Sequence, residues 1–238
     1  MPNFYIVATP IGNLKDISFR AIETLKGVDL ILCEDTRVTK KLLNYYEINT
    51  AILSYHQHSK AKKIDHIIDL LEQGKNLALV SDAGTPGISD PGNKLIQELV
   101  DSKIKINIVP IPGPCALITA ACISGLPMDR FLFLGFPPTK RKRKKFFNKV
   151  VKSEYSVILY ESKHRIMKTL IELKDVLQEV IRGKDSNFKV IVCQELTKKF
   201  ETIHQGNIEQ VIQKLEQSKL KGEFVIILGK TPIKKDSL

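Results

Sequence analysis

Residues 81–92, read SDAGTPGISDPG, have the composition of a ligand-binding loop. The glycines and prolines exclude a regular helix or strand. Small side chains let a ligand approach the backbone closely, and free N–H groups can face it. Asp82 and Asp90 add carboxylates that could accept hydrogen bonds from hydroxyls or balance a positive charge. Because long loops dense in such residues are usually functional, we predict a ligand site here rather than an elaborate turn.

A second group of chemically active residues follows the strand that we expect at residues 29–33. Glu34, Asp35 and Arg37 place two carboxylates beside a cation. Such a group could take part in catalysis or bind a ribose. Asp35 could equally cap a helix that begins at Thr36, so both interpretations stay open.

The sequence gives little support for a metal site, a disulfide or a membrane span. His56, His58 and His66 lie near one another, but no Cys or carboxylate cluster stands at ligand spacing, so we expect no metal. No apolar segment approaches the roughly 18 residues of a membrane span, and no signal peptide is recognisable. The cysteines are scattered, and we expect them to be reduced thiols of a cytoplasmic protein. They are Cys33, Cys115, Cys122 and Cys193.

Positive charge is concentrated in the second half of the chain. Residues 1–112 carry 13 Lys+Arg and 13 Asp+Glu, whereas residues 113–238 carry 24 and 13, which is the entire net charge of +11. Its densest part is an uninterrupted basic run, Lys140, Arg141, Lys142, Arg143, Lys144 and Lys145. Because no acid interleaves before Glu154, we favour a polyanion, nucleic acid above all, over a merely solvated charged face.

The first half alternates short apolar runs with amphipathic segments. Strands are expected at residues 4–8, 29–33, 51–55, 77–80 and 106–109, and helices at 19–26, 36–46, 59–73 and 93–100. This order predicts a parallel βαβ sheet, which binds ligands at the carboxyl ends of its strands. The dinucleotide fingerprint G-x-G-x-x-G is absent, since Gly12 is the only glycine before Gly27.

Residues 110–114 contain three prolines and a glycine and predict a domain boundary. We therefore expect an N-terminal α/β domain over residues 1–112 and a C-terminal α/β domain over 113–238. In the latter, strands are expected at 131–136, 156–160, 189–193, 200–204 and 222–229, and helices at 115–121, 165–180 and 209–220. Without strict alternation, these elements predict a mixed sheet.

A series of short motifs resembles, in order, the family of the bacterial ribosomal RNA small subunit methyltransferase I. These are YIVATPIGNL (5–14), CEDTR (33–37), the run 81–92, IPGP (111–114), GF (135–136), YES (160–162) with HR (164–165), ELTK (195–198) and GEF (222–224). Each is weak alone, but together they span nearly the whole chain. The chain departs from the family at Cys115, where serine is usual, and at Lys163, where proline is usual.

The resemblance implies a two-domain tetrapyrrole-methylase fold with S-adenosyl-L-methionine in the cleft between the domains. It further implies a homodimer that methylates the 2′-hydroxyl of a cytidine in the decoding region of 16S rRNA, as naked RNA or as the small ribosomal subunit. By likeness, the expected cofactor-binding residues are Pro10, Asp82, Ala83, Gly84, Thr85, Ile88, Cys115, Ala116, Tyr160, Leu196 and Glu223.

Methyl transfer to a ribose hydroxyl requires in-line alignment, and a base or cation near the hydroxyl oxygen would help. The candidates for that role are Glu34, Asp35, Arg37, Glu161, His164, Glu195 and Lys198. Among them we expect Asp35 with Arg37, and Glu161, to be catalytic. His164 and Arg165 are expected to bind RNA together with the basic run, and the target cytidine to be splayed out of its stack.

Two other functions remain open. A tetrapyrrole methylase acting on a small precorrin-like macrocycle would use the same scaffold but leave the basic run without a role. A non-catalytic RNA-binding protein that retains a methylase scaffold would fail to bind the cofactor.

Overall fold

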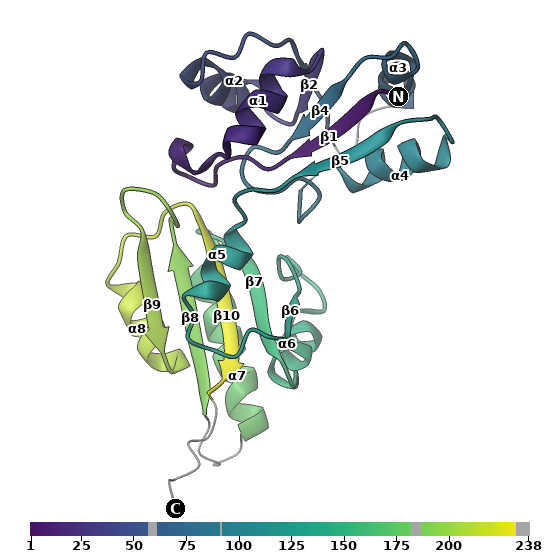
Figure 1. The fold of residues 1–238 in the computed structure, drawn as a ribbon. Helices are drawn as coiled ribbons and strands as arrows, with labels where there is room; N and C mark the ends of the chain where they lie inside the picture. The colour runs from purple at the N-terminus through teal and green to yellow at the C-terminus, as the bar shows by residue number, and fades with distance from the viewer. Residues whose placement is uncertain (57–60, 91, 182–186, 232–238) are drawn as a thin grey trace, which may run out of the picture. The chain divides into compact units, whose positions relative to one another are not determined.

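The computed structural model describes residues 1–56, 61–90, 92–181 and 187–231. The chain divides into two compact units, Met1–Cys115 and Ala116–Leu238 (Figure 1). Each unit is built around its own five-stranded sheet. The predicted fold class, a parallel sheet followed by a mixed sheet with helices, is confirmed.

The first unit contains an entirely parallel sheet in the order β3-β2-β4-β1-β5. Its strands are β1 (Asn3–Val7), β2 (Leu30–Cys33), β3 (Ile52–Ser54), β4 (Leu77–Val80) and β5 (Asn107–Ile111). The helices are α1 (Phe19–Gly27), α2 (Thr36–Tyr45), α3 (Ala61–Glu72) and α4 (Asn93–Asp101), with a short 3-10 helix over Leu14–Asp16. The start predicted for α3, at residue 59, lies outside the described residues.

Helices cover both faces of this sheet, as a parallel sheet requires. Successive residues of β4 point to opposite faces. Ala78 and Val80 pack in the core formed with α1 and α2, whereas Leu77 and Leu79 pack in the core formed with α3 and α4. The continuous apolar run 77–80 is therefore buried on two sides, and the chain can become polar only where β4 ends.

The second unit contains a mixed sheet in the order β6-β7-β10-β8-β9. The strands are β6 (Phe131–Phe133), β7 (Ser156–Ser162), β8 (Phe188–Gln194), β9 (Thr202–Gly206) and β10 (Glu223–Lys230). Strands β6 and β7 are parallel, and the remaining pairs are antiparallel. The helices are α5 (Ala116–Cys122), α6 (Arg143–Val151), α7 (Ile166–Ile181) and α8 (Ile208–Glu216).

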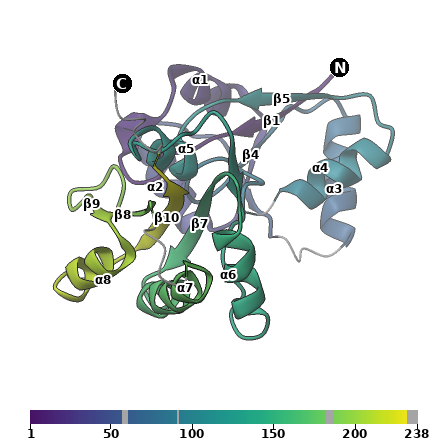
Figure 2. The same ribbon diagram turned by 90° about the horizontal axis from the view of Figure 1, so that it is seen from below.

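Helices α6, α7 and α8 lie side by side against one face of the second sheet, while α5 contacts β7 and β10 from the other face (Figure 2). Helix α6 was not predicted, because the basic run was interpreted only as a charged segment. The spacing of its buried residues explains how α6 packs against the sheet. Arg143, Phe147 and Val150 recur at helical spacing and are all buried, so the basic run enters the helix with one of its cations on the inward face.

Candidate functional site

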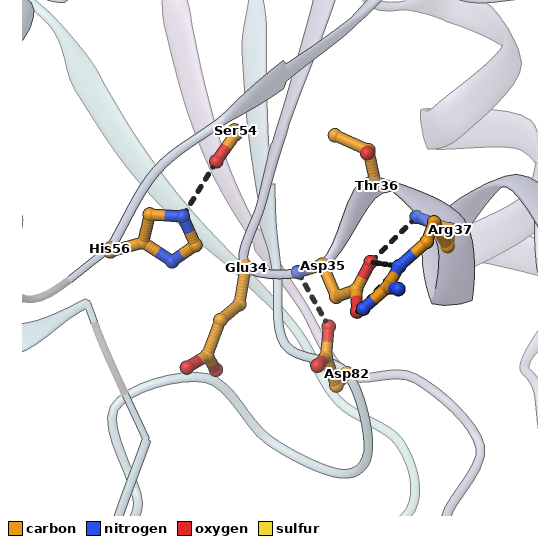
Figure 3. A pocket seen from close by; sticks show the side chains of 7 residues that line it. All are labelled: Glu34, Asp35, Thr36, Arg37, Ser54, His56 and Asp82. Atoms are coloured by element: carbon orange, nitrogen blue, oxygen red, sulfur yellow. Dashed lines mark hydrogen bonds and ion pairs between the residues drawn. The ribbon is translucent and has the colours of Figure 1, made fainter.

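A pocket of about 430 Å³ lies where three neighbouring parallel strands of the first unit end (Figure 3). Its lining residues are Glu34, Asp35, Thr36 and Arg37 after β2, Ser54 and His56 at the end of β3, and Asp82 after β4. Strands β3, β2 and β4 are adjacent, so their carboxyl ends converge. This is the position at which open α/β sheets bind ligands.

Asp35 lines this pocket, but its carboxylate is already bound by other groups of the protein. Its Oδ1 atom caps α2 by accepting the Arg37 backbone N–H at 2.8 Å, and its Oδ2 atom pairs with Arg37 Nη2 at 2.6 Å. The side-chain hydrogen bond from Arg37, followed by the backbone one, lowers the pKa of Asp35 to about 2. The helix-capping alternative therefore describes its contacts, and the carboxylate is a weak base.

Glu34 has the opposite electrostatic environment. Burial, followed by the charge of Asp82, raises the pKa of the Glu34 carboxyl above its ordinary value. Figure 3 shows this carboxylate apart from the Asp35–Arg37 pair. Two adjacent carboxyl groups thus have pKa values that diverge, an arrangement typical of sites that separate a proton acceptor from a structural anion.

Asp82 connects the predicted ligand loop to this pocket. Its Oδ1 atom accepts the Asp35 backbone N–H at 3.0 Å. On the far side of the pocket, Ser54 Oγ and His56 Nε2 lie 2.9 Å apart in a hydrogen bond. Prediction from sequence missed Ser54 and His56 as site residues. The sequence could have indicated them, because the strand at 51–55 follows the strand at 29–33 in the chain, and neighbouring parallel strands end at the same edge of a sheet.

The loop after β4 is fixed by its own hydrogen bonds. Thr9 and Gly84 exchange two backbone bonds of 2.8 and 3.0 Å, and Ser81 Oγ donates to Gly84 O at 3.0 Å. Gly84 has a φ of +85°, and a Cβ there would lie 3.4 Å from Ile11 Cγ2. The expectation of free N–H groups in this loop is therefore wrong for Gly84, whose N–H binds Thr9.

The other residues predicted for the cofactor in the first unit lie near this bridge. Thr85 Oγ1 donates to Pro114 O at 3.1 Å, which ties the loop to the segment after β5. Pro10 is buried directly after the bridge, Ala83 and Ile88 are exposed, and Cys115 is half-buried.

In the second unit the predicted cofactor residues are distributed over α5, β7, β10 and the segment after β8. Ala116 begins α5, and the Tyr160 hydroxyl in β7 accepts the Leu117 N–H at 3.1 Å. Leu196 is buried after β8, and Glu223 is exposed at the start of β10. The geometry thus brings Tyr160 to the start of α5.

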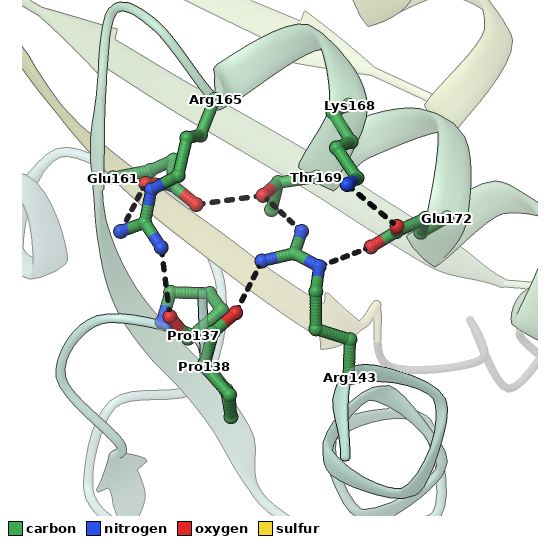
Figure 4. A network of polar contacts seen from close by, with 8 residues as sticks. All are labelled: Pro137, Pro138, Arg143, Glu161, Arg165, Lys168, Thr169 and Glu172. Carbon is green, nitrogen blue, oxygen red and sulfur yellow. Dashed lines mark hydrogen bonds and ion pairs between the residues drawn. The ribbon is translucent and has the colours of Figure 1, made fainter. Parts of the chain in front are cut away.

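Glu161 and Arg165 form a buried polar network with α7 (Figure 4). The Glu161 carboxylate is fully buried, pairs with Arg165 Nη2 at 2.8 Å and accepts the Thr169 hydroxyl at 2.6 Å. Arg165 Nη1 donates to Pro137 O at 3.1 Å. The expectation that Glu161 is catalytic is corrected, because its carboxylate is fully buried in contacts within the second unit. Arg165 belongs to the same network but keeps 23% of its side chain exposed, so its contact with RNA stays a prediction.

Arg143 belongs to the same network and is also corrected as an RNA-binding residue. Its side chain is only 6% exposed. The guanidinium pairs with Glu172 at 2.5 Å, donates to Pro138 O at 2.6 Å and donates to Thr169 Oγ1 at 2.8 Å. Together with Arg165 it holds successive carbonyls of the Pro137–Pro138 dipeptide.

The remaining cations of the run are exposed, as is His164. Lys144 makes an exposed ion pair with Glu179 at 2.8 Å. We call the exposed members the basic ridge, which consists of Lys140, Arg141, Lys142, Lys144 and Lys145. Because the buried network anchors the residues before α6, the ridge starts from a fixed backbone.

Within the described ranges, no three His, Cys, Asp or Glu side chains gather as a metal site would require. In the same residues, no helix is both long and apolar enough to cross a membrane.

Comparisons with known proteins give a consistent result. Residues 3–212 match the family of tetrapyrrole (corrin/porphyrin) methylases. Among curated proteins, "Ribosomal RNA small subunit methyltransferase I" of Halalkalibacterium halodurans is 45% identical over 227 residues, covering 94% of this chain and 74% of that protein. The protein of the same name from Hydrogenobaculum is 46% identical over 229 residues, covering 95% of each.

Among solved structures, a cobalt precorrin-4 methyltransferase of cobalamin biosynthesis aligns with a TM-score of 0.69 at 17% identity. The alignment covers 95% of this chain and 94% of that one. At this identity the likeness establishes the fold alone.

Proposed function

The chain belongs to the tetrapyrrole methylase family, and from that premise we propose that it methylates small-subunit ribosomal RNA, using S-adenosyl-L-methionine, at the 2′-hydroxyl of a cytidine. The observation that carries the proposal is the identity of 45% over 94% of the chain to a ribosomal RNA small subunit methyltransferase I. The family resemblance supports a homodimer as the acting form. The alternative of a small tetrapyrrole substrate is supported by the description of the family and by a likeness in fold at 17% identity, and both are less specific than the identity of 45% to a ribosomal RNA methyltransferase.

The residues at the strand ends fit a sulfonium cofactor in their chemistry. S-Adenosyl-L-methionine combines a positively charged sulfur with ribose hydroxyls. The pocket offers the carboxylates of Glu34 and Asp82, which can balance positive charge and accept hydrogen bonds from hydroxyls, whereas Asp35 is already paired with Arg37. When bound, this cofactor supplies an electrophilic methyl group. We propose that Asp82 and the loop 82–88, with Pro10, hold it in the first unit.

The carboxylates of the pocket then differ in what they can do for the reaction. A ribose hydroxyl must lose its proton as the new bond to carbon forms. A base with a pKa nearer the working pH accepts that proton more readily. We propose Glu34 for this role in place of Asp35, whose pKa of about 2 leaves it a weak base. Asp35 and Arg37 position the start of α2 beside the pocket.

The deciding experiment locates the methyl group. Purified chain, cofactor and small ribosomal subunits that lack the modification are combined, and the RNA is digested and analysed by mass spectrometry. We expect one cytidine to gain a methyl group on its ribose. A methyl group on a base, or transfer to a precorrin but not to RNA, would contradict the proposal.

The basic ridge should supply the salt-dependent part of RNA affinity. Changing Lys140, Arg141 and Lys142 to glutamine removes three exposed charges. If each contacts a phosphate, the slope of log K against log salt concentration should become shallower by roughly 2–3, at about 0.7–0.9 per lost contact. The slope is measured by fluorescence anisotropy with labelled RNA at several salt concentrations.

A matched control removes the same charge from the first unit. Lys94, Lys103 and Lys105 are exposed, and Lys103 shares the left-handed backbone of Lys142, with φ values of 58° and 67°. Their glutamine variant should keep the original slope. Equal slopes for the two triple variants would remove the ridge from the RNA interface.

A further inference from the structure

We propose that Phe200, flanked by Lys199 and Lys221, is a stacking site for an unpaired base of RNA. The inference rests on the proposed function for the class of its ligand. It adds a binding residue that lies outside both the basic ridge and the pocket of the first unit.

Phe200 is exposed in a way that core packing does not explain. The residue lies between β8 and β9 and is 63% exposed, and it belongs to no hydrophobic core cluster of the described residues. Its ring instead has two cations near it. Lys199 Nζ is 5.7 Å and Lys221 Nζ is 5.5 Å from the ring centroid.

The topology gathers further positive charge around this ring. Strands β7 and β8 both pair antiparallel with β10, so both end at the edge where β10 begins. The segments at this edge are connected, because the Lys163 N–H donates to Gly222 O at 3.2 Å and Gln194 Nε2 donates to Lys219 O at 2.9 Å. Exposed lysines on these segments are Lys163, Lys198, Lys199, Lys219 and Lys221.

The acidic residues at the same edge offset only part of this charge. Glu195 pairs with Lys198 at 2.8 Å, and Glu201 accepts the Thr197 N–H at 2.6 Å. Glu223 is exposed at the start of β10. Lys199 and Lys221 therefore remain as the cations nearest the ring.

The segment that carries Phe200 is held in an unusual conformation. Glu195 and Thr197 have φ values of 54° and 65°, which non-glycine residues seldom adopt. Backbone bonds from Lys198 N to Glu195 O at 3.0 Å and from Glu201 N to Lys198 O at 3.1 Å close the turn. Such strain persists where surrounding contacts enforce it and clusters at functional positions. The ring is thus presented on an ordered turn.

An exposed aromatic ring beside cations has the composition of a single-strand binding site. Bases stack on aromatic rings whatever their identity, and neighbouring cations contact the backbone phosphates. Exposed cation–π contacts are weak, so a base can displace the ammonium groups from the ring face. The released ammonium groups can then pair with phosphates on either side of the stacked base.

The chain has no tryptophan, so the Phe200→Trp variant introduces a single indole as a reporter. We expect a single-stranded RNA oligonucleotide to quench its emission and a blunt-ended duplex of that strand with its complement to quench it much less. The matched control is Phe19→Trp in the first unit, where the side chain is 87% exposed at the start of α1. This control should not be quenched by either RNA.

RNA affinities of two further variants distinguish two roles for Phe200. The ring either stacks on a base or only packs against the apolar stems of the neighbouring lysines. Phe200→Ala should weaken affinity for the single strand by about 5- to 150-fold, and Phe200→Leu, which keeps apolar bulk but loses the π face, should weaken it also. The salt slope should stay unchanged. Circular dichroism of each variant confirms that it is folded.

Several results would overturn the inference. These are an unquenched Phe200→Trp variant, a Phe200→Leu variant with unchanged affinity, and an emission shift of Phe200→Trp that depends on protein concentration without RNA, which would place this ring between two copies of the chain. Methylation by the unaltered chain is scored separately. Quenching without methylation supports stacking but rejects the proposed function, whereas methylation without quenching does the reverse.

Discussion

Replacing Glu34 with glutamine is expected to slow methyl transfer by about 10²–10⁴-fold, the usual contribution of a positioned proton acceptor. Glutamine keeps the size of the side chain but cannot take the proton of the ribose hydroxyl. The carboxylate of Glu34 is suited to this role because burial and the charge of Asp82 raise its pKa. Initial rates at saturating cofactor and RNA give the comparison.

The neighbouring carboxylate supplies the control. Asparagine caps helices about as well as aspartate, so Asp35→Asn should preserve the start of α2. With a pKa of about 2, Asp35 contributes little as a base, and its variant should keep the rate within a few-fold. If Asp35→Asn were as slow as Glu34→Gln, the assignment of the proton acceptor would have to be reversed.

The pH dependence has a definite sign. As pH falls through the raised pKa of Glu34, the base becomes protonated and the rate should fall, and the glutamine variant should lose this limb of the profile. The raised pKa also affects stability. At any pH above the pKa that Glu34 has in the unfolded chain, ionisation of its carboxyl destabilises the folded state relative to the unfolded one. Glu34→Gln should therefore melt at a higher temperature than the unaltered chain at pH 7, although it is much slower.

The sequence was most informative where local pattern and topology coincide. In the first unit, apolar runs and amphipathic segments alternate, and a parallel sheet then forces Glu34 and Asp82 to one edge. Strand ends were the least certain feature. The run 131–136, for example, was expected to be one strand, but β6 ends at Phe133, and Gly135 has a φ of +61°.

The second unit shows what local pattern leaves undetermined. Glu161 follows an apolar run and has the appearance of a strand-end carboxylate, yet β7 continues to Ser162. Alternation along that strand places Val157, Leu159 and Glu161 on the face that the helices cover. The partners of Glu161 are Arg165, directly before α7, and Thr169 within α7, so its buried role depends on tertiary packing.

Arg143→Met is expected to destabilise the second unit by about 2–4 kcal/mol, because it removes one partner of a buried ion pair and leaves polar groups unsatisfied. Glu172 loses a contact of 2.5 Å, and Pro138 O and Thr169 Oγ1 lose their guanidinium donor. Methionine retains the apolar stem against Phe147, whose ring centroid lies 5.2 Å from the Arg143 Cζ atom. The loss therefore measures the polar network rather than a cavity.

The next residue of the same run provides the matched control. Lys144 pairs with Glu179, but the two side chains are 70% and 54% exposed, so Lys144→Met should change stability by less than about 1 kcal/mol. Urea unfolding followed by circular dichroism, with amide hydrogen exchange in β7 and α7, compares the variants. Equal stability of the two would mean that the Arg143 network contributes nothing net. A large loss confined to Arg143→Met would show that Arg143 anchors, from within the basic run, the segment that displays the basic ridge.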